Sequence, residues 1–328
     1  MIPGDFAWMS HMLRGDFEAA WRLSDRGSRE RSAAGVTGAD WPRHLRPVWQ
    51  GVSLGGRDVL VRCHHGLGDT IQFMRYLPHL GDIARSVTLE VQPELAGLAS
   101  SLSGIDRLAT LGDVSADVPL AAYGGDVEVD ITELPWAFRT QLATIPADIP
   151  YLRADPARIA GAAERAPSRN GVLRAGLVWA AGEWKPDRSV PLALLDRLDA
   201  VPGLALYCLQ RGPEHARWQA CPAGPAMAGD LSSTDIADTA AAISRLDLVI
   251  TVDTMVAHLS GALGRPVWLL LHYAADWRWL LERDDSPWYP TMRVFRQRRP
   301  GDWAGVADRL AEALRSGAAM LSPASTPR

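Results

Sequence analysis

From Arg57 onwards, short runs of β-branched and aliphatic residues alternate with longer stretches in which apolar residues recur every three or four positions. The first run, RDVLVRC at 57–63, leads into a glycine-containing loop and a helical stretch, and a second run, SVTLEVQ, follows at 86–92. Short runs rich in valine and leucine are typical of buried strands. Strands that alternate with helices predict a parallel sheet with helices on both faces.

A second series of the same kind begins near residue 172. Its strand-like runs are VLRAGLVWAAG, LALYCLQRG, DLVITVD and PVWLLLHY, and its helical stretches are VPLALLDRLDAV, STDIADTAAAISRL and TMVAHLSGALG. In the second of these helices Ile236, Ala240, Ile243 and Leu246 share one face, as expected of a helix that covers a sheet. Two successive series predict an α/β protein with two Rossmann-like, doubly wound domains facing a cleft, with ligands at the carboxyl ends of the strands.

The predicted domain boundaries follow from where the alternation stops. Regularity is lost between Leu120 and Pro156, a stretch that holds four prolines, so the linker is placed at its end. We therefore predict a helical extension over 1–48, an N-terminal domain over 49–156 and a C-terminal domain over 157–328. The last helix begins with Asp302 as a plausible N-cap and is expected to pack back toward the N-terminal domain.

Composition narrows the class of protein. A net charge of −4 gives no general attraction to nucleic acid or to anionic membranes, and no apolar stretch is long enough to span a bilayer. Cys63, Cys208 and Cys221 show no CxxC spacing, so neither a disulfide framework nor a structural zinc site is predicted, and a cytoplasmic location is expected. A P-loop, a dinucleotide fingerprint and a GxSxG elbow are all missing from the sequence, which disfavours the corresponding ATPases, dehydrogenases and hydrolases.

Two segments of the second series carry candidate chemistry. At the junction of the strand DLVITVD with the next helix, free backbone N–H groups and the helix dipole suit a diphosphate, and His258 lies about one turn inside that helix. Equally, Asp253 or Thr254 could simply cap the helix while His258 packs on the sheet. The loop WAAGEWKPDRS at 179–189 places Lys185 and Arg188 beside the same edge, where they could stabilise a departing diphosphate or form an ordinary solvated loop.

A third segment, HHGLGDT at 64–70, follows the first strand. Asp69 stands at the start of a helix, where its carboxylate could accept a proton from a hydroxyl group or could act only as a helix cap. The pair His64 and His65 suggests a metal site. Because adjacent residues of a strand point to opposite faces, and no second ligand cluster is apparent, no metal site is predicted.

Taken together, these segments resemble glycosyltransferase family nine, the ADP-heptose:lipopolysaccharide heptosyltransferase superfamily. They are most similar to the C-terminal catalytic domains of bacterial tetratricopeptide-repeat glycosyltransferases. The stretches that carry the resemblance run from about Trp49 to Leu314 and are GLGDTIQFMRYLPHL, GLVWAAGEWKPDRSVPL, LYCLQRGPE, DIADTAAAISRLDLVITVDTMVAHLSGALGRPVWLLL and DWRWLLERDDSPWYPTMRVFRQRRPGDW. The opening LRGDFEAAWRLSDR resembles a degenerate last repeat.

The resemblance implies a GT-B fold and an inverting, metal-independent transfer of a sugar from a nucleotide diphosphate, with ADP-heptose as the suggested donor and no cofactor. It implies that Asp69 is the general base and that His258 is catalytic and contacts the donor. The other implied donor-binding residues are Lys185, Arg188, Ser189, Gln210, Asp253 and Thr254. The implied acceptor side comprises His64, His65, Gly68 and Gln72.

Two departures from the family pattern leave the substrates open. Heptosyltransferases carry a Gly-Pro-Met segment before the histidine, whereas this chain has Met255-Val256-Ala257, and relatives have an acidic or amide residue where His64 stands. The acceptor could be a glycan, a protein or a small molecule. A non-catalytic adaptor of GT-B fold and a sugar-nucleotide epimerase are the alternative functions. Because His258 and Asp69 are both present, the adaptor is disfavoured.

Overall fold

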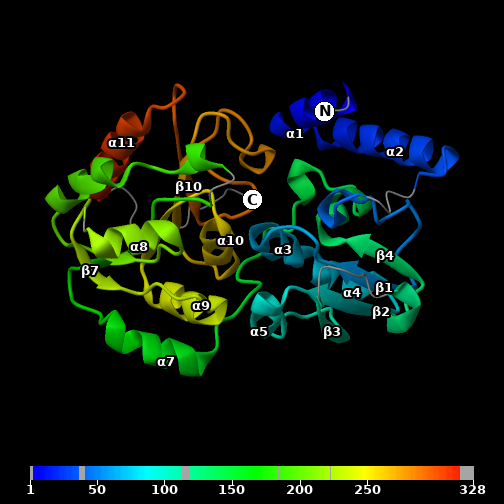
Figure 1. Ribbon diagram of the computed structural model, residues 1–328, viewed down its shortest axis with the longest axis horizontal. Coiled ribbons are helices and arrows are strands. Elements are labelled where there is room, and N and C mark those ends of the chain that lie inside the picture. Colours follow the sequence, from blue (N-terminus) through cyan, green and yellow to red (C-terminus); the bar gives the residue numbers. More distant parts are fainter. Residues whose placement is uncertain (1–2, 37–40, 113–118, 183–184, 222, 318–328) are drawn as a thin grey trace. The chain divides into compact units, whose positions relative to one another are not determined.

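A computed structural model describes residues 3–36, 41–112, 119–182, 185–221 and 223–317. The chain forms two compact units, of which the first comprises Met1–Ala147 with Asp276–Leu281 and the second Asp148–Ala275 with Glu282–Arg328. Residues 1–48 thus belong to the first unit, whose main segment ends before the boundary predicted at residue 156. Figure 1 shows the helices and strands of each unit.

The first unit contains a parallel four-stranded sheet in the order β3-β2-β1-β4. Its strands are β1 (Asp58–Arg62), β2 (Ser86–Val91), β3 (Arg107–Thr110) and β4 (Val127–Asp130). Its helices are α1 (Pro3–Leu13), α2 (Phe17–Ala33), α3 (Leu67–Phe73), α4 (Leu77–Ile83), α5 (Ala96–Ala99) and α6 (Leu134–Ala137). The central strand β1 is buried over its last four residues, so its carboxyl end emerges from the core.

The N-terminal helical stretch breaks between α1 and α2. Gly15 has a φ of +75°, a left-handed conformation that glycine adopts without steric cost, and the chain turns there. Asp16 then caps α2 through the N–H of Ala19.

The second unit contains a parallel six-stranded sheet in the order β10-β9-β8-β5-β6-β7. Its strands are β5 (Leu173–Val178), β6 (Leu204–Cys208), β7 (Met227–Asp230), β8 (Leu248–Val252), β9 (Val267–Leu271) and β10 (Met292–Arg296). Its helices are α7 (Pro156–Arg165), α8 (Pro213–Ala220), α9 (Ile236–Arg245), α10 (Met255–Ala262) and α11 (Trp303–Arg315). Strands β8 and β9 are buried over their whole length. The two Rossmann-like α/β units predicted from the sequence are confirmed.

Of the helices predicted for the second unit, one has a different type and another begins where it was predicted to begin. The stretch VPLALLDRLDAV forms a 3-10 helix, η8 (Leu192–Ala200), rather than an α-helix. Helix α11 begins after Asp302, which caps it as predicted by accepting from the N–H of Gly305. It packs against η8 and β10 within the second unit, and its predicted packing toward the N-terminal domain stays a prediction.

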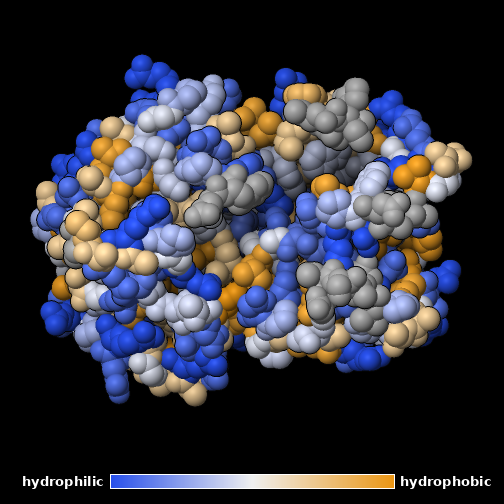
Figure 2. All heavy atoms as spheres, in the orientation of Figure 1, coloured by the Kyte–Doolittle hydropathy of each residue, from blue (hydrophilic) through white to orange (hydrophobic). Residues whose placement is uncertain are grey.

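The large aliphatic and aromatic residues are mostly buried within the units, while Figure 2 shows a surface that mixes hydrophilic and hydrophobic residues. Among the described residues, no helix combines the length and the apolar character needed to cross a membrane.

Candidate functional site

In the second unit, basic and acidic side chains meet where the central strands end. Asp253 directly follows β8 and is buried. The Nη1 atom of Arg188 lies 3.5 Å from the Oδ2 atom of Asp253 and donates to the Asp253 carbonyl oxygen at 3.4 Å. Because β5 and β8 are neighbours in the sheet, the loop after β5 that carries Arg188 reaches the residue that follows β8.

A second basic residue, His272, lies at the same edge, directly after β9. Burial lowers the pKa of His272, and the positive charges of Arg188 and Lys185 lower it further. A ring whose protonation is opposed by nearby cations marks a region of positive potential. This edge therefore suits an anion such as a diphosphate.

The helix that begins at this edge is α10, with Thr254 at its N-cap position. The Thr254 side chain makes no capping bond within the described chain, and its hydroxyl lies 3.3 Å from that of Thr251. His258 is buried in the body of the helix, and its Nδ1 atom lies 3.0 Å from the hydroxyl of Tyr289. Thr254 therefore does not cap the helix through its side chain, while the Asp253 carboxylate lies beside Arg188.

Gln210 supports the loop that follows β5. Its Oε1 atom accepts from the backbone N–H groups of Trp179 and Ala180 at 3.1 and 2.9 Å. Its Nε2 atom donates to the carbonyls of Ala180 and Arg211 at 3.2 and 2.9 Å. The whole amide is used inside the protein, so Gln210 holds the loop in place, and its implied binding of the donor stays a prediction. Ser189 acts in the same way, accepting from the N–H of Ala181 at 3.1 Å.

In the first unit, the predicted base Asp69 lies in the first turn of α3. Its Oδ2 atom accepts from the N–H of the N-cap residue Gly66 at 3.2 Å, so the carboxylate helps to cap the helix. Its Oδ1 atom accepts from Arg278, with which it forms an ion pair. An ionised carboxylate has about four lone-pair positions, so both oxygens keep the capacity to accept another hydrogen bond. The capping role and a role as base are therefore compatible.

Arg278 is held in place by its neighbours in the first unit. Its Nη1 atom donates to Asp276 at 2.8 Å, and its guanidinium lies over the rings of Phe73 and Trp277. Trp277 in turn packs edge-on against Trp8 and Phe17 of the N-terminal helices, with ring centroids 6.1 and 6.0 Å apart. The N-terminal helices thus help to anchor the segment that brings Arg278 to Asp69.

The two adjacent histidines do not point in opposite directions as predicted. The Nδ1 atom of His64 lies 3.8 Å from the Oδ2 atom of Asp130, and the Nε2 atom of His65 lies 3.4 Å from its Oδ1 atom. Strand β1 ends at Arg62, so the alternation of a strand no longer applies to these residues. Of the other residues assigned to the acceptor side, Gly68 lies in the first turn of α3 and Gln72 is fully buried in that helix.

The sequence was compared with family models and with curated proteins. No family model matches the chain. A relative, the protein FlbA of Caulobacter vibrioides, is 26% identical over 351 residues, and the alignment covers 97% of this chain and 56% of FlbA. The chain therefore spans about half the length of that relative.

The alignments with solved structures cover nearly the whole length of those structures, in contrast to the alignment with FlbA. The glycosyl transferase family 9 structure from Veillonella parvula has a TM-score of 0.57 and 14% identity, covering 81% of this chain and 99% of that one. The ADP-heptose LPS heptosyltransferase II of E. coli has a TM-score of 0.58 and 12% identity, covering 79% and 98%. The chain has the fold of the family nine glycosyltransferases.

Within this family nine fold, sequence reasoning placed the strand-to-helix junctions correctly but missed three residues. His272 could have been found, because it directly follows a strand that was predicted from the sequence, and ligands of such sheets bind at the carboxyl ends of the strands. Arg278 and Tyr289 lie in the stretch DWRWLLERDDSPWYPTMRVFRQRRPGDW that carries the resemblance, but neither follows a predicted strand, so nothing singled them out within it. The predicted link to repeat-containing enzymes and the predicted catalytic roles stay predictions.

Proposed function

We propose that this chain is a glycosyltransferase that moves a sugar from an ADP-linked donor to an acceptor hydroxyl, with inversion and without a metal ion on the diphosphate. The observation that carries the proposal is the cluster of Lys185, Arg188 and His272 around Asp253 and the start of α10. The E. coli neighbour named for ADP-heptose supports an ADP-sugar as donor.

The proposed reaction is a single displacement. A carboxylate oxygen of Asp69 takes the proton of the acceptor hydroxyl as the hydroxyl oxygen attacks the anomeric carbon. The bond between that carbon and the diphosphate oxygen breaks, and ADP leaves with the electron pair. Arg188 and Lys185 stabilise the negative charge that grows on the leaving diphosphate, which is the role otherwise filled by a metal ion.

A thermal-shift screen tests the donor. We expect ADP to raise the melting temperature equally with and without EDTA, and UDP and GDP to raise it less, because a ligand that binds only the folded state stabilises it. Arg188→Gln should weaken ADP binding about 10- to 100-fold, since a charged hydrogen bond contributes about 1.5–3 kcal/mol. Arg169→Gln removes an exposed cation of the same unit and serves as the control. Absence of a shift with every nucleotide would instead favour the adaptor.

A second variant tests the role of His258. Tyr289→Phe removes a hydroxyl that lies 3.0 Å from the His258 ring and 3.5 Å from the Tyr151 hydroxyl, so the ring loses one orienting hydrogen bond. We expect ADP to bind roughly 3- to 10-fold more weakly, from a bond worth about 1 kcal/mol. Isothermal titration calorimetry would measure this, with Tyr273→Phe, which changes an exposed tyrosine of the same unit, as control. Equal affinities in all three proteins would remove His258 from the proposed donor site.

A further inference from the structure

Three side chains with metal-binding atoms meet at one end of the second sheet, apart from the residues assigned to the donor. Cys208 is the last residue of β6, Asp230 is the last residue of β7, and His215 lies in the first turn of α8. One ligand atom from each of the three lies within 4.8 Å of the other two. A thiol, an imidazole and a carboxylate at this separation form a mixed ligand set rather than an acidic surface patch.

A bulge in β7 brings Asp230 to this position. The pairing of β6 with β7 runs from Leu206 opposite Met227 to Tyr207 opposite Gly229, so Ala228 is an extra residue. Asp230 is therefore paired with Cys208, and residues paired across parallel strands point to the same face. Without the extra residue, Asp230 would be one position out of register and would point to the opposite face. Bulges that re-aim a side chain in this way are frequent at functional sites.

Neighbouring groups orient the imidazole and the carboxylate. The Nε2 atom of His215 lies 2.8 Å from the Oδ2 atom of Asp230 and 3.0 Å from the Oγ atom of Ser232. The N–H of Ser232 donates to the other Asp230 oxygen at 2.9 Å. The contact from the Ser232 N–H leaves the Oδ2 atom of Asp230 open to an ion, and outer contacts of this kind orient metal ligands in known sites.

We propose that Cys208, His215 and Asp230 bind a borderline-soft divalent cation, with zinc the best fit. Zinc takes cysteine, histidine and aspartate ligands in a tetrahedral arrangement, whereas calcium and magnesium prefer all-oxygen sites. Zinc bonds of about 2.0–2.3 Å place ligand atoms roughly 3.5 Å apart. A separation at the 4.8 Å limit of the cluster would shorten by about 1.3 Å, and the contact of 2.8 Å between His215 and Asp230 would lengthen. The ion replaces the direct contact of His215 with Asp230 by bonds to both.

The cysteine loses its proton when the ion binds. A thiol that coordinates a divalent cation is deprotonated, so Cys208 binds the ion as a thiolate. Binding therefore releases one proton to solvent and needs no oxidant or reductant.

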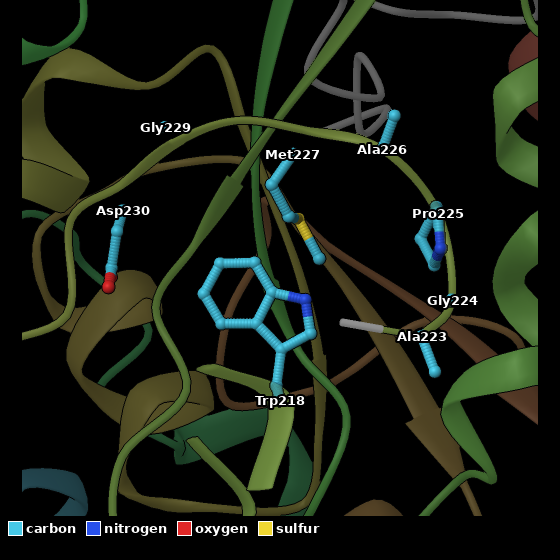
Figure 3. A pocket seen from close by; sticks show the side chains of 8 residues that line it. All are labelled: Trp218, Ala223, Gly224, Pro225, Ala226, Met227, Gly229 and Asp230. Atoms are coloured by element: carbon cyan, nitrogen blue, oxygen red, sulfur yellow. The ribbon is translucent and has the colours of Figure 1, made fainter. Parts of the chain in front are cut away.

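The ion has an access path and room for a fourth ligand. Asp230 also lines a pocket of about 350 Å³, together with Trp218, Met227 and the chain from Ala223 to Ala226 (Figure 3). Asp230 is exposed and His215 is half-buried, so water can reach the ion as a fourth ligand.

Cobalt substitution of the full chain tests this site. After treatment with a chelator, the protein is titrated with Co²⁺ and its absorption is recorded, and Zn²⁺ is then added to displace the cobalt. We expect one equivalent of Co²⁺ to give a thiolate-to-cobalt charge-transfer band, which Zn²⁺ abolishes.

Ligand variants decide whether the band belongs to this cluster. Cys208→Ser should abolish it, while Cys221→Ser, which removes an exposed cysteine of the same unit, should leave it unchanged. If Cys208→Ser does not fold, Asp230→Asn and His215→Asn change more exposed groups and should each weaken Co²⁺ binding relative to the wild-type protein. A missing band in the wild-type protein, or a band lost only in Cys221→Ser, would overturn the proposal. ADP binding is measured against a buffer of the same metal content, so failure of this site and failure of the proposed transferase are distinguishable.

Discussion

Replacing Asp69 with asparagine is expected to lower the rate of sugar transfer by about 10²- to 10⁴-fold, because a positioned general base contributes a factor of this size. Donor affinity should remain unchanged, since the residues proposed to hold the diphosphate all belong to the second unit. Transfer would be measured with the labelled ADP-sugar that binds the protein and an extract of cells that lack its gene as the acceptor source. Calorimetry would measure donor binding.

Two further variants separate the base from its structural contacts. Asp82→Asn removes an exposed carboxylate from α4 of the same unit and should leave turnover unchanged. Arg278→Gln breaks the ion pair with Asp69 but keeps the carboxylate, so it should retain far more activity than Asp69→Asn. If the two variants lost equal activity, Asp69 would act only by anchoring Arg278. Normal turnover in Asp69→Asn would assign it to helix capping alone.

Replacing Arg62 with methionine is expected to reduce the free energy of unfolding of the first unit by about 3–5 kcal/mol. Arg62 is buried at the end of β1 and donates to Glu90 at 2.9 Å and to Glu128 at 2.8 Å. Burial acts to lower the pKa of Arg62, but the carboxylates of Glu128 and Glu90 outweigh it and the pKa is raised. Methionine leaves the buried charge of Glu90 without its cation, and that desolvated charge is the source of the cost.

An exposed counterpart in the same unit provides the control. Arg85 also bridges two carboxylates, those of Asp58 and Asp126, but it lies at the surface. Because solvent screens such pairs, Arg85→Met should destabilise the unit far less than Arg62→Met. Urea titrations followed by tryptophan fluorescence would compare the two variants. Similar losses of stability would show that burial does not govern the strength of the Arg62 network.

The sequence by itself determined the α/β architecture and the position of the strand-to-helix junctions. The six strands predicted from apolar runs are the six with a neighbour on each side, β1, β2, β5, β6, β8 and β9. Such strands are enclosed by neighbours and helices, so burial leaves a continuous apolar signature. A helix N-cap also depends only on residues that are close in the sequence, so Asp302 could be identified as the N-cap of the last helix from the sequence alone.

The tertiary structure alone decided the edges of the sheets and the partners of the site residues. The missed strands β3, β4, β7 and β10 are the four edge strands, and in β3 and β7 the side chains are largely exposed, so no apolar pattern marks them. Asp69 and Arg278 are 209 residues apart, and His258 and Tyr289 are 31 apart. Pairings over such separations depend on the folded path of the chain rather than on local preference. The same holds for Cys208 and Asp230, because only the bulge at Ala228 turns Asp230 toward the thiol.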